Sequence, residues 1–467
     1  MYLESEKLKE ECGVFGIFDK NGFNTAEMTY YGLYALQHRG QESAGIAVND
    51  KGRIIYHKQM GMVPEIFDDV ILNHLKGQAA IGHVRYSTSG ESLEENIQPL
   101  VLKYTKGHMA LAHNGNLVNA DVLREELEDQ GTLFHTTTDS EVIAALLSRL
   151  RVKHHSIEEA LVETMGIIKG AYSLAILTPK KLIGARDPLG MRPLCIGKKE
   201  DSYILASEST AFNAVGATLI RDVEPGEIVI ISDEGIKSIY VDRPEKSATC
   251  MFEYIYFARP DSIMEGIEIY KSRLEAGKVL AKEHPVEADV VIGVPDSGLA
   301  AARGYAIQSG IPYGVGFIKN RYVGRTFIQP SQFMREQGVH LKLTPVLSEI
   351  KGKRVVMIDD SIVRGTTSRK IVKLLKDAGA KEVHVRVSSP PVKHSCYFGI
   401  DTPERENLIA SSNSIEKIRE KICADSLGFI SREGLLSTPV EGAKCQFCTA
   451  CFDGIYPMET IHKKENK

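Results

Sequence analysis

The chain has 467 residues, of which 57 are Lys or Arg and 61 are Asp or Glu. This length is enough for about two or three domains with complete cores, and the nearly balanced charge gives no support to a nucleic-acid or membrane-surface partner. No apolar run is long enough to cross a bilayer. Eight cysteines in so long a chain do not resemble a secreted disulfide scaffold, so we expect a reducing, cytoplasmic location.

Residues 1–11 are charged and lack the apolar core of a signal peptide. Cys12 follows them and opens the apolar run 12–18, which predicts a strand. Taken alone, a cysteine at this place is more often a small buried residue than a nucleophile. Further motifs in the first half of the chain change that interpretation, and they occupy residues 34–43, 82–88, 112–116 and 138–140.

Together with Cys12, these motifs resemble the class II glutamine amidotransferases, which are N-terminal-nucleophile hydrolases. The resemblance implies an α+β domain with four layers in the order αββα. It assigns Cys12 as the nucleophile that attacks the amide of glutamine, and its own α-amino group, with a reference pKa near ~8, as the base. That nitrogen cannot act while residue 11 acylates it, so residues 1–11 are expected to be a propeptide removed before activity.

The same resemblance assigns the other groups that amide hydrolysis needs. Asn114 and the backbone N–H of Gly115 match the oxyanion hole, where one donor can be worth about 10²–10³ in rate. Arg85 matches the residue that pairs with the carboxylate of glutamine, which suits a guanidinium fork. Asp139 matches the acceptor for the α-ammonium group of glutamine. Taken separately, Arg85 and Asp139 would be interpreted as members of surface ion pairs, and only the joint pattern favours a substrate site.

Apolar runs alternate with turns from residue 153 to 242 and predict strands that complete the first domain. The composition changes at residues 242–247, so we expect an amidotransferase domain at 12–245 and a second domain at 246–467. The aromatic segment after Cys250 resembles the linker of the glutamine phosphoribosylpyrophosphate (PRPP) amidotransferases. Most of its aromatic residues are expected to pack between the domains, and they are also of the right type to line a passage for ammonia. They are Phe252, Tyr254, Tyr256 and Phe257.

Predicted strands alternate with helices in the second half and indicate a parallel sheet. The strands are expected near residues 290, 313, 355 and 383. Residues 321–338 show no periodicity, and a loop of this length in a compact domain is usually functional or disordered. This segment resembles the flexible loop that closes over pyrophosphate.

Residues 354–367 combine a buried strand, an acidic pair and the start of a helix. Asp359 and Asp360 directly follow the apolar run, at the edge of a parallel sheet where open α/β folds bind ligands. The hydroxyls and N–H groups that open the next helix suit a phosphate. No lysine of the GKT kind follows, which argues against a nucleoside-triphosphate P-loop. The whole run resembles the PRPP signature of the type I phosphoribosyltransferases, which implies an α/β domain with a parallel sheet.

This resemblance assigns a set of ligand-binding residues. Asp359 and Asp360 would hold the ribose and one Mg²⁺ per subunit, and Ser297 would be a further Mg²⁺ ligand, although a serine before a helix is as commonly a cap. Lys319 and Arg321 are expected near the pyrophosphate, with a solvated basic face as the competing interpretation. The remaining PRPP-binding residues are expected to surround the 5′-phosphate, and they are Ser361, Arg364, Gly365, Thr366 and Thr367.

Cysteines near the C-terminus form a C-x2-C-x2-C pattern at Cys445, Cys448 and Cys451. By spacing alone, zinc and an iron–sulfur cluster are equally compatible with it. The resemblance to the cluster-bearing branch of the glutamine PRPP amidotransferases implies one [4Fe–4S] cluster per subunit. Its ligands would be Cys250, Cys396, Cys448 and Cys451, while Cys445 leaves the choice among the last ligands open.

Both halves together resemble the glutamine PRPP amidotransferase family over essentially the whole chain. The family makes 5-phosphoribosylamine, glutamate and pyrophosphate from PRPP, glutamine and water, the first step of de novo purine synthesis. It also implies a homotetramer inhibited by purine nucleotides, with no nucleic-acid or membrane partner. A hexosamine or asparagine synthase would lack the signature at 354–367. A non-enzymatic PRPP-sensing regulator would need a DNA-binding segment and would leave the Cys12 motifs without a purpose.

Overall fold

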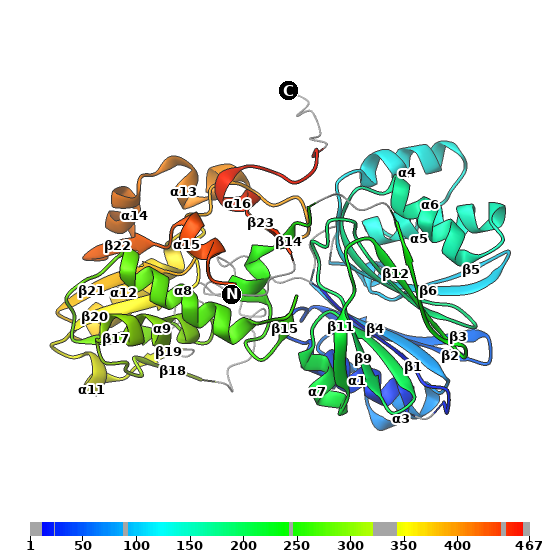
Figure 1. Ribbon diagram of the computed structural model, residues 1–467, viewed down its shortest axis with the longest axis horizontal. Helices are drawn as coiled ribbons and strands as arrows, with labels where there is room; N and C mark the ends of the chain where they lie inside the picture. Colours follow the sequence, from blue (N-terminus) through cyan, green and yellow to red (C-terminus); the bar gives the residue numbers. More distant parts are fainter. Residues whose placement is uncertain are drawn as a thin grey trace.

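The computed structural model describes residues 12–22, 24–86, 92–241, 246–320, 343–439 and 445–460. Two domains lie side by side, with the N-terminal domain on the right of Figure 1 and the C-terminal domain on the left. Short strands β14 and β23 lie between them. No helix among the described residues is long and apolar enough to span a membrane.

Within the described residues, the N-terminal domain holds two antiparallel sheets. Their strand orders are β11-β9-β10-β1-β4-β2-β3 and β13-β12-β8-β7-β6-β5. The first sheet contains β1 Gly13–Phe18, β2 Ser43–Asp50, β3 Arg53–Met60, β4 Ala79–Arg85, β9 Cys195–Lys199, β10 Ser202–Ala206 and β11 Thr218–Asp222. The second sheet contains β5 Leu100–Tyr104, β6 Gly107–Leu117, β7 Gly170–Leu177, β8 Leu182–Arg186, β12 Glu227–Ser232 and β13 Gly235–Tyr240.

The two sheets pack face to face, and helices cover both outer faces. Alternation along β1 explains this arrangement, because Val14 faces the residues of the second sheet while Phe15 faces the helices. The predicted four-layer αββα domain is therefore confirmed. The helices on the first sheet are α1 Thr25–Ala35, α2 Val63–Ile66, α3 Asp69–His74 and α7 Thr210–Val215. Those on the second sheet are α4 Ala120–Asp129, α5 Asp139–Lys153 and α6 Ile157–Ile167.

The C-terminal domain is built on a parallel sheet with the order β17-β20-β21-β22. Helices α8 and α9 pack on one face and α12 and α14 on the other, which buries the apolar run of β20 on both sides. The predicted parallel sheet is confirmed, with β22 as a strand that the sequence pattern did not predict. The elements are α8 Ile269–Glu283, β17 Val290–Gly293, α9 Leu299–Ser309, β20 Arg354–Asp359, α12 Thr366–Asp377, β21 Glu382–Val387, α14 Ile415–Ile422 and β22 Ser426–Phe429.

The strand predicted near residue 313 is wrong as a full member of this sheet. Tyr313 forms only a single parallel bridge to Val291. Two glycines let the chain lie close to β17 here, because a Cβ on Gly316 would lie 2.5 Å from Ile292 and one on Gly314 would lie 2.7 Å from Val290. The chain instead pairs next in a separate antiparallel hairpin, β18 Phe317–Lys319 with β19 Leu343–Pro345.

Short elements complete the second half and its junction with the first. Strand β14 pairs in parallel with β23, so the C-terminal segment is joined to the linker. The π-helical turn η2 Glu253–Phe257 is separated from the end of β14 by two residues. The short elements are β14 Thr249–Cys250, β15 Ile263–Met264, β16 Ile267–Glu268, α11 Leu347–Ile350, α13 Ile409–Ser412, α15 Arg432–Leu436, β23 Phe447–Cys448 and α16 Ala450–Asp453, with 3-10 turns at Glu94–Asn96 and Arg405–Asn407.

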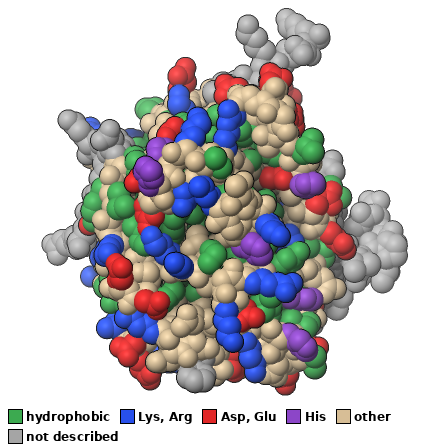
Figure 2. All heavy atoms as spheres, turned by 90° about the vertical axis from the view of Figure 1, so that its right-hand side faces the viewer, with side chains coloured by type: hydrophobic (Ala, Val, Ile, Leu, Met, Phe, Trp, Pro, Cys, Tyr) green, Lys and Arg blue, Asp and Glu red, His purple; other side chains and the backbone are tan. Residues whose placement is uncertain are grey.

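Charged side chains of both signs are interspersed over the face of the molecule shown in Figure 2. This view shows no broad patch of one sign, which agrees with the nearly balanced composition.

Candidate functional site

Cys12 lies immediately before β1, the central strand of the first sheet, and is 7% exposed. Its Sγ donates a hydrogen bond to the carbonyl oxygen of Tyr86 at 3.4 Å. Burial raises the pKa of the Cys12 thiol to about 11, so the thiol is protonated at neutral pH and needs a base to become a nucleophile. The predicted propeptide, residues 1–11, lies outside the described residues.

The predicted oxyanion hole lies on β6. The Nδ2 atom of Asn114 is buried and has no hydrogen-bond partner among the described residues. A buried N–H donor without a partner destabilises the folded protein. Such a donor is typical of a site where a ligand supplies the missing acceptor. Gly115 has a φ of +144°, and a Cβ there would lie 2.0 Å from the carbonyl oxygen of Ala171. Only glycine can therefore occupy this place on the strand.

The residues assigned to the head group of glutamine lie close to Cys12. The charges of Arg85, Glu42 and Asp139 all act on the pKa of the thiol, which shows that the fold brings these groups together. Nη1 of Arg85 donates to Oε1 of Glu42 at 2.6 Å. One N–H group of the Arg85 guanidinium is therefore bonded to Glu42 in this structure. The resemblance assigned the same guanidinium to the carboxylate of glutamine.

Asp139 opens α5 and is 5% exposed. Burial alone would raise the pKa of its carboxyl group, but the neighbouring His113 and a hydrogen bond from the Leu117 N–H at 2.9 Å hold that pKa below its ordinary value. The side chain is therefore ionised at neutral pH, and it can accept an ammonium group.

The predicted PRPP site is assembled at the carboxyl end of β20. Asp359 and Asp360 are 1% and 0% exposed. Oδ1 of Asp360 accepts a hydrogen bond from Ser361 Oγ at 2.6 Å, and Oδ2 accepts one from Ser297 Oγ. The fold thus places Ser297, from the loop after β17, directly beside the acidic pair, as the assignment to one Mg²⁺ site requires.

Gly365 caps the helix that follows this pair. Its φ is +83°, the left-handed region, and α12 begins at the next residue. Thr367 is buried at 6% exposed, whereas Arg364 and Thr366 are exposed to solvent. Lys319 donates from Nζ to Oδ2 of Asp296 at 2.7 Å.

Arg321 and the segment 321–338 lie outside the described residues. The predicted roles of this segment in pyrophosphate binding and closure therefore stay predictions.

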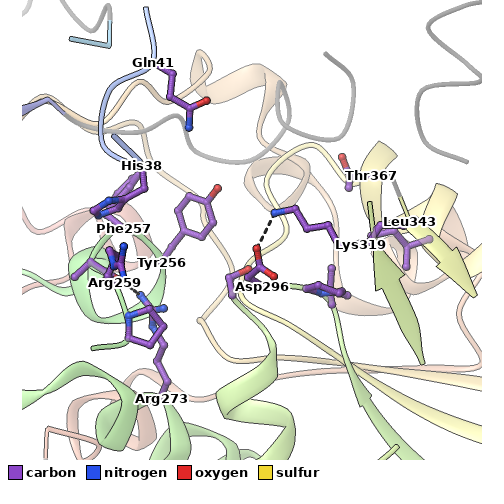
Figure 3. A pocket seen from close by; sticks show the side chains of 16 residues that line it. His38, Gln41, Tyr256, Phe257, Arg259, Arg273, Asp296, Lys319, Leu343 and Thr367 are labelled. Carbon is purple, nitrogen blue, oxygen red and sulfur yellow. Dashed lines mark hydrogen bonds and ion pairs between the residues drawn. The ribbon is translucent and has the colours of Figure 1, made fainter. Parts of the chain in front are cut away.

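A cavity of about 360 Å³ lies at the junction of the two domains. In Figure 3, the side chain of Tyr256 points into it, between His38 and Gln41 of the first domain and Asp296 and Lys319 of the second. Three members of the predicted PRPP site line the same cavity, and they are Ser297, Lys319 and Thr367.

The linker aromatics divide into two pairs. Tyr256 and Phe257 line the cavity. Phe252 packs on Phe452 with ring centroids 5.5 Å apart, and Tyr254 packs edge-on against Phe447 at 5.2 Å. The rings of Phe252 and Tyr254 thus pack against the C-terminal segment, and the role of the four residues in a passage for ammonia stays a prediction.

The cysteines assigned to a cluster are neighbours in the structure. Cys250 and Cys448 are direct register partners of β14 and β23. Burial raises the pKa of Cys250 to about 12, and the charges of Cys448 and Cys396 contribute to this rise. The pKa of Cys451 is raised by burial and by Cys250, Cys448 and Cys396.

Cys445 has different surroundings. Burial raises its pKa to about 12, with Glu265, Arg186 and Asp222 as the main neighbouring charges and a side-chain hydrogen bond to Thr249. Among the described residues, no three His, Cys, Asp or Glu side chains converge closely enough to hold a metal ion. A four-iron cluster is larger than one ion, and its ligands stand correspondingly farther apart.

The second domain also touches the oxyanion strand, which the sequence did not reveal. Asn116 Nδ2 donates to the carbonyl oxygen of Tyr397 at 2.9 Å. A Cβ on Gly399, whose φ is +108°, would lie 3.2 Å from the carbonyl carbon of Gly115. The segment after Cys396 therefore packs directly against the predicted oxyanion hole.

Sequence reasoning also missed a buried ionic network around Arg39, Glu208 and Glu253, which are all 0–1% exposed. Glu253 could have been noticed, because it is the only charged residue in the apolar and aromatic segment 250–257. A charge in such a segment needs a buried partner.

These features define a class of protein: an N-terminal-nucleophile glutamine amidotransferase domain joined to a phosphoribosyltransferase domain. Comparison with known protein families gives the same two domains. The glutamine amidotransferase domain matches residues 83–214 and the phosphoribosyl transferase domain matches residues 261–405.

Curated relatives cover nearly the whole chain. An amidophosphoribosyltransferase of Bacillus subtilis is 52% identical over 98% of this chain and 96% of its own length. One of Archaeoglobus fulgidus is 52% identical over 96% of this chain and 98% of its own length. The chain therefore belongs to the amidophosphoribosyltransferase family.

Solved structures give the same result. The glutamine PRPP amidotransferase of B. subtilis complexed with ADP and GMP superposes with a TM-score of 0.90 at 52% identity, covering 96% of this chain and 98% of that one. A structure described as the allosteric regulatory enzyme of purine biosynthesis superposes with a TM-score of 0.91, also at 52% identity, covering 96% of this chain and 97% of the other.

Proposed function

We propose that this protein catalyses the first step of de novo purine synthesis, in which PRPP, glutamine and water give 5-phosphoribosylamine, glutamate and pyrophosphate. The observation that carries the proposal is the cavity at the domain junction. It is lined on one side by His38 and Gln41, which belong to the amidotransferase motif at residues 34–43, and on the other by Ser297 and by Thr367 of the PRPP signature.

In the glutaminase half-reaction, Cys12 Sγ attacks the amide carbon of glutamine after its proton passes to the α-amino group freed by propeptide removal. Asn114 Nδ2 and the N–H of Gly115 stabilise the negative oxygen that forms. Ammonia leaves, and water then releases glutamate from the Cys12 thioester. Asp139 and Arg85 hold the ammonium and carboxylate ends of the substrate, which fixes the amide against the thiol.

In the synthetic half-reaction, ammonia attacks C1 of the PRPP ribose and displaces pyrophosphate. The amino end of α12 offers N–H groups and the Thr367 hydroxyl to the 5′-phosphate. Asp359, Asp360 and Ser297 offer the oxygen ligands that Mg²⁺ prefers, and the ion would neutralise charge on the leaving pyrophosphate. The two aspartates are buried and adjacent in sequence, and Ser297 Oγ reaches Asp360, so the oxygen atoms gathered here form a donor set that suits Mg²⁺.

We expect ammonia to pass from the glutamine site to the PRPP site without leaving the protein. Released into water it would be protonated and diluted, whereas the cavity beside Tyr256 offers a sheltered route. We expect PRPP to raise glutaminase activity, with glutamate and phosphoribosylamine formed one to one. We expect Tyr256→Ala to yield more glutamate than phosphoribosylamine, because the cavity wall is opened. Measuring both products with and without PRPP checks this.

The matched control is Tyr240→Ala, which removes an exposed aromatic ring on β13 and should keep the one-to-one ratio. If an ammonia-trapping reagent in solution intercepts the nitrogen equally well in the unmodified protein and in Tyr256→Ala, there is no protected route at this junction. Failure of the chain to consume PRPP with either glutamine or ammonia would contradict the proposed reaction itself.

We also propose one [4Fe–4S] cluster per subunit on Cys250, Cys396, Cys448 and Cys451. The support is the mutual neighbourhood of these thiols, which come from the linker, the segment after β21 and the C-terminal segment. When bound, the cluster would tie these parts together, and its loss should loosen the C-terminal half.

The cluster assignment predicts roughly four irons per chain and a brown protein. Cys451→Ser should lose the iron and the colour and lower the unfolding temperature, since one of four ligands is gone. Cys445→Ser is the matched control and should retain both, because its surroundings are Glu265 and Thr249 rather than the other thiols. The measurement is iron content, visible absorbance and thermal unfolding after anaerobic purification. A colourless and fully active protein containing zinc would refute the assignment.

Regulation by purine nucleotides and assembly as a homotetramer complete the proposal. Support for the first comes from the B. subtilis relative described as complexed with ADP and GMP and from a second relative described as an allosteric enzyme of purine biosynthesis.

A further inference from the structure

A buried guanidinium joins the nucleophile to the linker between the domains. Arg39 lies in the turn after α1 and is 1% exposed. Its Nε donates to the carbonyl oxygen of Cys12 at 3.1 Å. The same side chain holds Glu253 in a fork, with Nη2 to Oε1 at 2.5 Å and Nη1 to Oε2 at 3.0 Å. One rigid planar group therefore contacts both the backbone of Cys12 and the first residue of the linker turn.

A second carboxylate fixes the other end of the same linker. Oε1 of Glu208 accepts from Arg39 Nη1 at 2.5 Å. Its Oε2 accepts from the backbone N–H of Arg259 at 2.9 Å and from Ser262 Oγ at 2.7 Å. The turn Glu253–Phe257 is thus held to Arg39 directly at its start and through Glu208 beyond its end.

The same turn forms a wall of the cavity at the domain junction. Tyr256, three residues after Glu253, points into the cavity (Figure 3). Arg273 of α8 also lines it, and donates from Nε to the carbonyl oxygen of Tyr254 and from Nη2 to that of Ala258, both at 2.7 Å. A short helical turn held by these hydrogen bonds moves as a unit. If the side chain of Tyr256 is displaced, Glu253 moves with it and shifts the guanidinium of Arg39.

The backbone of the turn that carries Arg39 is packed tightly against the first sheet. A Cβ on Gly40 would lie 2.5 Å from the carbonyl carbon of Val84, so the chain here is pressed against β4. The Arg39 side chain contacts Glu253, Glu208 and the backbone of Cys12, so a shift of the linker turn would be felt along these contacts. Because a small misplacement of a nucleophile costs a large factor in rate, such an adjustment would change how well Cys12 attacks glutamine.

We propose that Arg39 is a positioning residue for Cys12 and that Glu253 sets the position of Arg39 according to the state of the linker turn. Occupation of the cavity by PRPP then changes the rate of glutamine hydrolysis through Tyr256, Glu253 and Arg39. This inference rests on the proposed function, since it names the residues that connect its two half-reactions.

The test is Glu253→Gln in the full-length holoenzyme. The amide keeps the shape of the side chain and removes the charge that orients Arg39. We expect the stimulation of glutaminase by PRPP to fall by about fivefold or more, within the usual range of coupling between sites. The change should appear in kcat rather than in the KM for glutamine, and synthesis from free ammonia should persist.

Alkylation of Cys12 by iodoacetamide gives a second readout that a purely structural role would not move. In the unmodified protein we expect its rate to change when PRPP is added, and in Glu253→Gln we expect no change. Glu265→Gln is the matched control, because Glu265 forms another buried pair near the junction, with Arg186 Nη1 at 2.6 Å, and should keep the response to PRPP.

Arg39→Lys keeps the charge but loses the fork, and should show the same loss of response as Glu253→Gln. Stimulation by PRPP that persists in both variants overturns the inference and leaves the proposed function intact. Equal loss of glutamine-dependent and ammonia-dependent synthesis also overturns it, because the pair would then be holding the whole fold. Absence of stimulation in the unmodified protein overturns both this inference and the proposed connection between the half-reactions.

Discussion

Cys12→Ala is expected to abolish synthesis from glutamine and to leave synthesis from free ammonia unchanged. Only the nucleophile is lost, since the carbonyl oxygen of residue 12 can still accept the hydrogen bond from Arg39. The predicted PRPP site lies in the other domain, at the carboxyl end of β20. The measurement is phosphoribosylamine formation with each nitrogen source, together with glutamate release.

Cys195→Ala is the matched control for this change. Cys195 is also buried, at 2% exposed, but it begins β9 and donates to the carbonyl oxygen of Ala206 at 3.2 Å. We expect it to retain both activities. Equal loss of glutamine-dependent and ammonia-dependent synthesis in Cys12→Ala would contradict the division into two sites.

Asp359→Asn is expected to have the converse effect. Asp359 ends β20 beside Asp360, and its Oδ1 accepts from the Asp360 N–H at 3.0 Å. Replacing the carboxylate removes charge from the proposed Mg²⁺ and ribose site. The kcat/KM for PRPP should fall by about a hundredfold or more. Even the loss of a residue that only hydrogen-bonds to a metal ligand lowers metal affinity or activity by about 10–100-fold. Basal glutaminase activity, measured without PRPP, should be largely spared.

Asp289→Asn serves as the control on the same sheet. Asp289 lies at the opposite end of β20, where it pairs with Arg354 at 3.0 Å on the surface. Exposed pairs of this kind contribute little, so PRPP use should not change. If Asp359→Asn retains the affinity for PRPP at physiological Mg²⁺, the acidic pair has only a structural role.

Much of the fold could be predicted from local patterns. The apolar run before Asp359 became β20, and the amphipathic pattern after Gly365 became α12. These predictions succeed because side-chain periodicity and glycine conformation act over a few residues. The prediction near residue 313 failed as a full strand, because Tyr313 makes a single bridge to Val291 and the next residues pair with β19, a partner that no local pattern reveals.

The candidate site residues could be named from motifs, but the motifs do not say which of them touch. Sequence reasoning placed Asp360 and Ser297 in one site, and the structure joins them by a hydrogen bond across 63 residues of chain. It named four aromatic residues as candidates for one passage, and of these Tyr256 and Phe257 line the cavity while Tyr254 and Phe252 pack against Phe447 and Phe452.

The sequence by itself determined the two halves of this protein and the cysteine pattern near the end of the chain, and it predicted Cys12 as the nucleophile and the acidic pair as part of a PRPP site. Only the tertiary structure decided that Cys250 lies beside Cys448, that one cavity is shared by both domains, and that Arg39 reaches Glu253 across 214 residues. The reason is physical. Backbone and periodicity preferences are local, whereas distances between remote side chains depend on how all the layers pack at once.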